Sequence, residues 1–584
     1  MRELFLLIFS ATLMLGYSQP IYADQDQQRL ADEGTQLVKK YCYGCHGEKF
    51  NGNAQFNVLD RQSLLNEKLK YVVPGNLNQS KMWLRLDGDM PPEDQPQPTE
   101  AEKETIKEWI LAGAPNVKRQ KRAFISEADV LKLILTDLQQ IRQNDRIYQR
   151  YFSLAHLYNN NRDVTDFDLR LYRAAFSKAI NSLSWEPDIV VPHVVKTVDD
   201  QQFILRVDLR DLGWKGDDWA AILRVYPYGL KFNNVADAET REIDRQLELF
   251  SGTPLAYVRA DWLTVTATRP PLYHQLLKIP MTDRELEKRL NVDPANDFIQ
   301  NRLKRAGFKE SGVSTANRAL DRFSSAFGWY WKSYDFAPGN AKGDLLRFPL
   351  GPKFHGNPFN EHAAFEQDGG EIIFSLPNGL QGYMLVDKDG NRIDEGPIAV
   401  VRDLKEISGT PVVVNGISCM HCHQHGMIQF KDTVRDGLAV FGELREKAQD
   451  LIPIQEDMSK YVKRDSKRFL ISLDEATGPF LKVNEDKQKN IERFPEPIGA
   501  IARFYERRLS LEQAAFEIGI QDPEKLRTAI KYNSNLKRIG LGPLANGDKI
   551  NRAEWESREF ITSPMQESAR ILELATPLFF IGSK

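Results

Sequence analysis

The pattern of apolar and polar positions opens with one continuous apolar run. After Arg2, residues from Leu4 to about Tyr17 are almost all apolar, and a short polar stretch precedes Ala23. This order is typical of a secretion signal (residues 1–23) that is cleaved after Ala23, which leaves Asp24 as the first residue of the exported chain. The run is shorter than the roughly 20 residues of a membrane-spanning helix, and no second run of that length follows. We therefore expect a periplasmic chain with no membrane span after cleavage.

Helical periodicity then predicts a small domain over residues 24–118. Apolar residues at helical spacing indicate a helix over 27–41. Near the end of the domain, Thr99 and Glu102 make a capping-box pattern for another helix, which stops at Gly113.

Beyond this domain the pattern changes between helical and extended stretches. Helices are predicted over 127–142 and 167–182, and partial alternation predicts a strand over 203–209. Residues 119–345 are therefore expected to form a mixed α/β region.

Residues 346–480 are predicted to be rich in β-hairpins. Two apolar stretches, 372–376 and 383–387, are joined by the turn signal Pro377-Asn378-Gly379. A further strand is expected at 411–414, directly before a cysteine-containing segment.

The last region, 481–584, is predicted to be helical. Ser510 caps one helix and Pro523 stands at the first position of the next. These two short helices have the spacing of a helix-turn-helix, but export argues against DNA binding. The patterns together predict a multidomain α+β protein, with a small all-α domain, then a mixed helical and β-hairpin-rich region, and a helical C-terminal part.

Length and charge narrow the choice of partners. At 584 residues the chain is too long for one domain core, and its formal net charge of −3 gives no reason to expect nucleic acid or an anionic membrane. A basic run at 118–122 is interpreted as a solvated linker, with docking of an acidic redox partner as the alternative.

Cysteine usage points to specific chemistry. The chain has four cysteines, and all lie in two C-x-x-C-H segments, Cys42-Tyr43-Gly44-Cys45-His46 and Cys419-Met420-His421-Cys422-His423. This pattern indicates covalent haem attachment, because two thiols at this spacing add to the two haem vinyl groups and the histidine that follows reaches the iron. A C-x-x-C pair also occurs in thioredoxin-like and zinc sites. The histidine in both copies argues against those sites, so we predict two covalent haem c groups.

Met90 is the candidate for the second axial ligand of the first iron. It precedes Pro91-Pro92, and a stiff loop suits a weak iron–sulfur bond. The alternative is an ordinary core methionine. The polar residues before it, Asp87-Gly88-Asp89, favour the ligand.

Four segments of the first domain stand in a familiar order: Cys42 to Gly47, Val73-Pro74-Gly75, Met90-Pro91-Pro92, and Trp109-Ile110 with Gly113-Ala114. In order and spacing they resemble the planctomycete-type cytochrome c domain. The resemblance covers about the first fifth of the exported chain and implies a small helical haem domain, His46 and Met90 as axial ligands, and electron transfer. The stretch Asn51-Gly52-Asn53-Ala54 departs from the usual Gly-Gly-Leu without touching a ligand.

The sixth ligand of the second iron is left open by the sequence. His425 and Met427 follow His423 too closely to reach the opposite face of the ring, and His421 is expected to point away. The more distant candidates are His355, His362, Met384 and Met458. We prefer Met458 and His362, which lie in polar segments. If neither binds, the iron has an open position that could bind peroxide or dioxygen.

Other residues are given a structural interpretation first. The aromatic-rich segment 323–336 is read as packed core, with a cover over a haem face as the alternative. His156, His193 and His274 have no ligand-like spacing and are expected to be packed or surface residues.

Three functions remain open. The first is a dihaem cytochrome that transfers electrons to or from a redox partner protein, such as a donor or acceptor cytochrome. The second is a dihaem redox enzyme with an open second haem, since the ten or so residues around Cys419 resemble the haem loops of bacterial dihaem peroxidases and their oxygenase relatives. The third is a haem-bearing sensor or scaffold. Substrate turnover and oligomeric state are not decided by the sequence.

Overall fold

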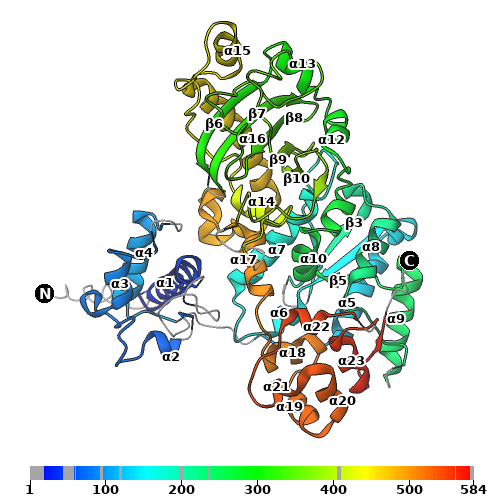
Figure 1. Cartoon of the computed structure of the whole chain (residues 1–584). Helices are drawn as coiled ribbons and strands as arrows, with labels where there is room; N and C mark the ends of the chain where they lie inside the picture. Colours follow the sequence, from blue (N-terminus) through cyan, green and yellow to red (C-terminus); the bar gives the residue numbers. More distant parts are fainter. Residues whose placement is uncertain are drawn as a thin grey trace, which may run out of the picture. The chain divides into compact units, whose positions relative to one another are not determined.

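The chain divides into two compact units, residues 1–121 and 122–584 (Figure 1). The computed structural model describes the following residues: 19–43, 46, 58–59, 61–92, 97–116, 122–197, 202–234, 237–311, 314–403, 410–559 and 561–578. The apolar run of the expected secretion signal lies outside them. Within these ranges no helix is both long enough and apolar enough to cross a membrane.

The smaller unit is built from helices around a compact core. Its helices are α1 (Gln19–Tyr41), α2 (Arg61–Leu64), α3 (Lys81–Leu86) and α4 (Glu100–Leu111). Helix α4 begins with the predicted capping box, in which Thr99 accepts a hydrogen bond from the Glu102 backbone and Glu102 accepts one from the Thr99 backbone. Trp109 and Ile110 of α4 pack with Val38 of α1 in the core. Helix α1 starts at Gln19, earlier than predicted, and so continues through the expected cleavage site.

A six-stranded antiparallel sheet is the largest β element of the larger unit. Its strands follow one another as a meander in the order β11-β10-β9-β8-β7-β6. They are β6 (Lys304–Ser311), β7 (Ser314–Ser325), β8 (Gly328–Asp335), β9 (Gly369–Ser375), β10 (Gln381–Asp387) and β11 (Arg392–Ile393). The predicted hairpin is confirmed as β9 and β10, whose register pairs Tyr383 with Ile373.

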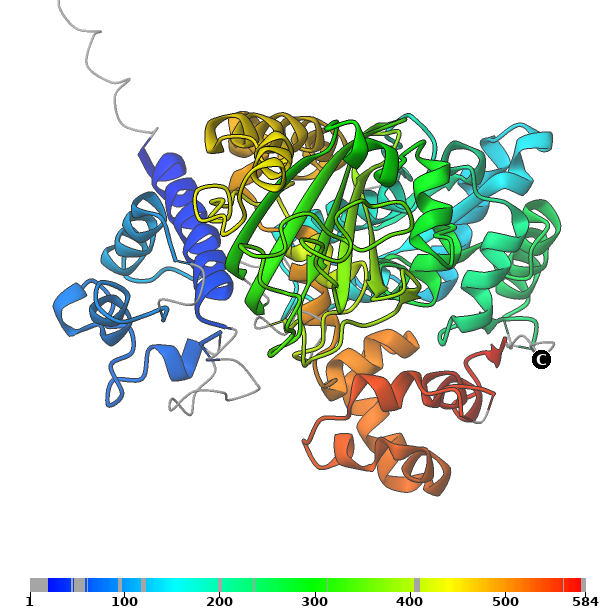
Figure 2. The ribbon, with the colours of Figure 1, turned by 45° about the horizontal axis from the view of Figure 1, so that its top comes forward.

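Different helices cover the two faces of this sheet. Helix α16 (Gln455–Leu481) lies on one face, where Asp465 accepts hydrogen bonds from Arg322 and Trp331. On the other face Lys332 donates to Asp283 at the start of α12 (Asp283–Arg289). Figure 2 shows the strands as a twisted layer with helices packed around it. The aromatic-rich segment forms the β7–β8 hairpin, and its aromatic residues are largely buried in the common core.

Helix α7 (Asp166–Ser182) lies at the centre of the larger unit and is buried over most of its length. It packs against α16 and also against α10 (Ala260–Ala267) and α17 (Pro497–Tyr505). The predictions of α7, of α5 (Glu127–Gln140) and of strand β3 (Ile204–Asp208) are confirmed.

The remaining elements complete this unit. A second sheet has the order β2-β3-β1-β5, with β2 (His193–Val194), β3 (Ile204–Asp208), β1 (Gln149–Ser153) and β5 (Tyr257–Arg259), and β4 (Leu230–Lys231) pairs with β12 (Thr576–Pro577). The other α-helices of at least five residues in the described part of this unit are α6 (Ala155–Asn159), α8 (Gly216–Val225), α9 (Ala238–Ser251), α11 (Leu272–Leu276), α13 (Pro294–Ile299), α14 (Ile417–Cys422), α15 (Glu443–Leu451), α18 (Leu511–Ile518), α19 (Pro523–Tyr532), α22 (Arg552–Glu556) and α23 (Pro564–Ile571). The capped pair α18–α19 confirms the helical prediction for the C-terminal region.

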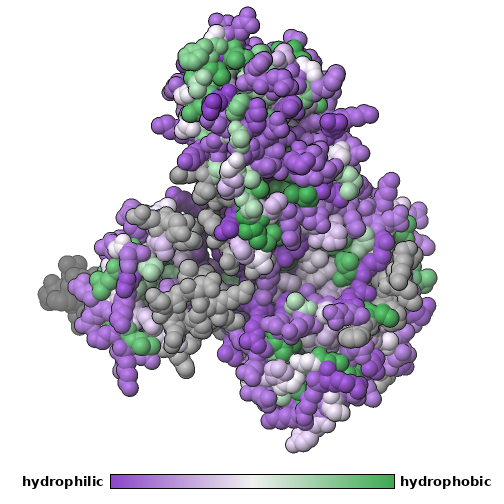
Figure 3. Space-filling view, viewed as in Figure 1, coloured by the Kyte–Doolittle hydropathy of each residue, from purple (hydrophilic) through white to green (hydrophobic). Residues whose placement is uncertain are grey.

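One hydrophobic cluster runs through the whole larger unit, from Val130 to Ala575. The three stretches distinguished in the sequence, 119–345, 346–480 and 481–584, all contribute to it. Hydrophilic residues predominate on the face of this unit that Figure 3 presents.

The strand predicted at 411–414 does not form. Val414 makes only an isolated bridge with Glu395, and Val413 packs in a small cluster with Leu385 and Val401. The neighbouring edge strand β11 is two residues long, so it offers too few backbone groups for a further strand to pair with. The second C-x-x-C-H segment therefore follows an irregular stretch and lies in the short helix α14.

Candidate haem sites

The first C-x-x-C-H segment begins where α1 ends. Cys42 and Tyr43 pack against the core of the smaller unit. The His46 backbone donates a hydrogen bond to the Cys42 carbonyl (2.9 Å), and the His46 carbonyl accepts one from Val58 (2.7 Å). Burial lowers the pKa of His46, which favours the neutral imidazole that binds a metal. Cys45 lies outside the described residues.

Met90 lies at the surface of the same unit. Its backbone N–H donates to the Arg85 carbonyl (2.8 Å) at the end of α3. The Gln97 amide donates to the carbonyls of Pro91 and Pro92, which joins this loop to the approach of α4. Met90 is 38 % exposed, so a role in core packing does not account for it. Its thioether remains the predicted axial ligand.

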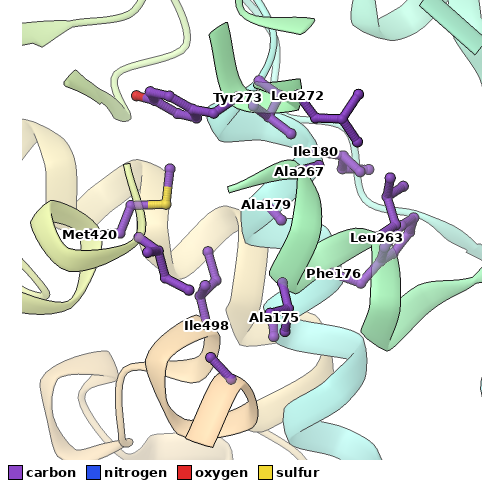
Figure 4. Packing of buried hydrophobic residues seen from close by; sticks show 14 of the residues in the cluster. Ala175, Phe176, Ala179, Ile180, Leu263, Ala267, Leu272, Tyr273, Met420 and Ile498 are labelled. Atoms are coloured by element: carbon purple, nitrogen blue, oxygen red, sulfur yellow. The ribbon is translucent and has the colours of Figure 1, made fainter. Parts of the chain in front are cut away.

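Helix α14 presents the second pair of cysteines. Cys419 and Cys422 are three residues apart on this helix, and such residues lie on one helix face. Met420 points elsewhere, into a cluster that includes Ile498 of α17 and residues of α7 and α11 (Figure 4). The helix is thus anchored on one side by packing and presents its thiols on another.

His423 is held in a defined orientation. Its Nδ1 lies 3.2 Å from the Gly426 carbonyl oxygen, and because a carbonyl only accepts, Nδ1 carries the proton. The other ring nitrogen, Nε2, is then the one suited to bind iron. Burial is the main cause that lowers the pKa of His423, so the ring is neutral near pH 7. The ring of Tyr383 lies 6.1 Å away, centroid to centroid.

Two residues just before α14 fix where this helix starts. Gly416 has a φ of +87°, and a Cβ there would lie 2.4 Å from the Thr268 carbonyl oxygen. The buried Asn415 donates from Nδ2 to Nε2 of His274 (2.7 Å). Burial lowers the pKa of His274 to about 4, which keeps the ring neutral as this contact requires.

A buried ionic group faces α14 from the sheet. Arg318 of β7 donates to Asp335 of β8 at 2.5 Å and lies 3.9 Å from the Glu371 carboxylate of β9. Glu371 lies on the same face of the sheet as Tyr383, the residue whose ring is close to His423. The amino-acid pattern did not predict the role of these three residues of the ionic group. The available signal was Glu371, an acidic residue directly before the apolar run Ile372-Ile373-Phe374.

His421 faces the opposite side of α14. Its Nδ1 lies 3.8 Å from Oε2 of Glu496, which caps the N-terminus of α17. The other oxygen of Glu496 pairs with Lys178 at 2.6 Å. His156 and His274 are buried and His193 is exposed, in accord with the structural role predicted for them.

The proposed sixth ligands lie in different surroundings. The chain after His423 contacts α16 at Ser466, whose hydroxyl accepts from the Met427 backbone. Met458 is buried on α16 eight residues earlier, about 12 Å along the helix axis. His362 and His355 are exposed on the loop before β9, and Met384 alternates with Tyr383 and so faces the other side of the sheet.

The side chains at the second segment fit a covalently bound haem. Two thiols share one helix face, and a neutral histidine whose Nδ1 is occupied follows them directly. Cys42 and His46 supply the same residue types at the first segment.

Comparison with protein families matches residues 42–94 to the family described as planctomycete cytochrome C. The matched stretch contains the first C-x-x-C-H segment and Met90, so the resemblance seen in the sequence is confirmed for this part. The chain therefore contains a cytochrome c domain, which implies covalently bound haem c and a role in electron transfer. The chain matches no curated protein and no solved structure.

Proposed function

We propose that this chain is an exported, periplasmic dihaem c-type cytochrome that transfers electrons through haems bound at Cys42/Cys45 and Cys419/Cys422. The observation that carries the proposal is the second segment, where a fixed neutral histidine directly follows two cysteines on one helix face. The family match supports the first haem. A redox partner protein would deliver or accept the electrons.

Each residue of the two haem sites would have a specific role. Cys42 and Cys45, and Cys419 and Cys422, would form the thioether bonds, and His46 and His423 would bind iron. Met90 would complete the first site, where a thioether ligand favours the reduced state and gives this centre the higher potential. When bound, each haem supplies a one-electron carrier, and the packing of α14 on α17 keeps the second in a fixed place.

Counting haems tests the proposal. We expect the purified exported chain to hold two covalent haems after denaturation, and C419S/C422S and C42S/C45S each to hold one. Redox titration of the wild type should show two one-electron steps, and the resting ferric protein should show no high-spin signal. One haem in the wild type, unchanged by C419S/C422S, would refute the second site.

A dihaem enzyme with an open second iron is the second candidate. It is favoured by the placement of Met458 and His362 and by the polar side chains Glu371, Arg318 and Tyr383 around the second segment. Here a high-spin ferric signal would appear, and hydrogen peroxide would be turned over with a reduced cytochrome as donor. If cyanide leaves the spectrum of the second ferric iron unchanged, the enzyme proposal is excluded.

A further inference from the structure

The ionic group that faces α14 carries more negative than positive charge. Two carboxylates, Glu371 and Asp335, share one guanidinium, that of Arg318. Asp335 takes the direct contact at 2.5 Å, whereas Glu371 lies 3.9 Å from the cation. The side chains are 14 % (Glu371), 10 % (Arg318) and 4 % (Asp335) exposed, so water screens this charge weakly.

This group is adjacent to the second attachment segment. Burial and then the Glu371 carboxylate raise the pKa of Cys419 well above its usual value. Glu371 and Arg318 also act electrostatically on the ring of His423. Glu371 is therefore near both the attachment cysteine and the proposed iron ligand.

The sheet register also places Glu371 on the side of His423. Glu371 is two residues before Ile373, which pairs with Tyr383, so the three side chains point to one face of the sheet. The ring of Tyr383 lies 6.1 Å from that of His423, centroid to centroid. Arg318 is the cation that holds the Glu371 carboxylate on this face.

We propose that Glu371 sets the reduction potential of the second haem, with Arg318 as the residue that positions it. The ferric state carries one more positive charge than the ferrous state, and a nearby buried carboxylate stabilises it preferentially. Glu371 therefore lowers the potential of this haem and widens its difference from the methionine-ligated first haem. This inference rests on the proposed second haem.

Two substitutions at Glu371 distinguish the effect of its charge on the reduction potential from the effect of its shape. Glu371→Gln removes the charge at nearly constant volume, whereas Glu371→Asp retains it. The matched control is Glu366→Gln, because Glu366 lies on the loop before β9 and its side chain forms an exposed ion pair with Lys353. Each full-length variant is first checked for two haems, and the step of the second haem is assigned with C42S/C45S.

We expect Glu371→Gln to raise the midpoint potential of the second haem. A tenfold change in the one-electron equilibrium constant, which corresponds to about 59 mV, is the expected scale. Glu371→Asp and Glu366→Gln should remain close to the wild type. A purely structural role for Glu371 would not give this charge-dependent order.

Two other results have separate meanings. In the first, the wild type and Glu371→Gln both hold two haems, and Glu371→Gln leaves the potential of the second haem unchanged or lowers it. That result would refute the role of Glu371 and would leave the proposal of a second haem intact. If the wild type lacks a haem at Cys419 and Cys422, the proposed function itself fails. Should Glu371→Gln not fold, a potential for Glu371→Asp that is at least 59 mV from the wild type would also refute the charge argument.

Discussion

The Lys178–Glu496 ion pair connects the central helix α7 to α17, which supports α14. The Lys178 ammonium lies 2.6 Å from the Glu496 carboxylate, and both side chains are almost completely buried. Burial by itself would raise the pKa of Glu496, but Lys178 and His421 more than offset it, and the pKa falls to about 2. The Glu496 carboxylate therefore depends on Lys178 to remain charged inside the protein.

Removal of one partner should be costly. Lys178→Met leaves the Glu496 carboxylate buried without its cation, and we expect the free energy of unfolding to fall by about 3–5 kcal/mol. Lys132→Met breaks the exposed pair of Lys132 with Glu239 and should lower the free energy of unfolding far less. Urea denaturation of both variants provides the comparison. Equal effects would show that burial of the pair does not matter.

The same pair predicts a pH dependence. The pKa of Glu496 is lower in the folded state (about 2) than its ordinary value of 4.5, so the ionised carboxylate stabilises the fold above about pH 4.5. This stabilisation is lost as the pH falls toward 2. Denaturation curves across this window should show a steeper loss of stability for the wild type than for Glu496→Gln. Parallel curves would contradict the assignment.

Among the elements, α14 depends most on a single backbone position. Gly416 has a positive φ, and a methyl group there would meet the Thr268 carbonyl and the ring of Tyr273. Neither neighbour can move easily, because both belong to the buried core or its backbone. The start of α14, and with it the position of Cys419, therefore requires glycine.

We expect Gly416→Ala to destabilise the larger unit by at least about 1–3 kcal/mol and to alter the spectrum of the second haem. Gly442→Ala is the control, since Gly442 also has a positive φ but has no atom within 4 Å of the added methyl. Urea denaturation and the absorption spectrum of each resting protein measure the two effects. A smaller effect at Gly416 than at Gly442 would refute the packing argument.

At the scale of the whole molecule, the two units have separate hydrophobic cores. The cluster of the smaller unit includes Trp109 and Ile110, and that of the larger unit runs from Val130 to Ala575. A unit with its own hydrophobic core can in principle fold and unfold separately. The proposed electron transfer thus involves two independently built haem sites.

This separation predicts two unfolding transitions for the full chain. A fragment of residues 122–584, produced behind residues 1–23 as the proposed secretion signal, should reproduce the transition of the larger unit and hold one haem. Thermal unfolding followed by circular dichroism, with a haem count on the same samples, tests this. A fragment that fails to fold would show that the larger unit needs residues 1–121.

Local patterns predicted many of the elements. The capping box at Thr99, the β9–β10 hairpin and helices α5 and α7 depend on periodicity and on residues close in sequence. The segment 411–414 looked equally strand-like. No strand forms there because a strand needs a neighbouring strand to pair with, and the edge strand β11 is too short to provide that partner.

The sequence by itself predicted the haem attachment that we propose for both segments, because the two cysteines and the histidine of each segment lie close together in the chain and their spacing is local. It also determined the family of the first domain. Only the tertiary structure decided which residues surround the second segment. Glu371, Arg318 and Glu496 come from β9, β7 and the start of α17 and meet α14 through sheet register and helix packing, which link residues far apart in the chain.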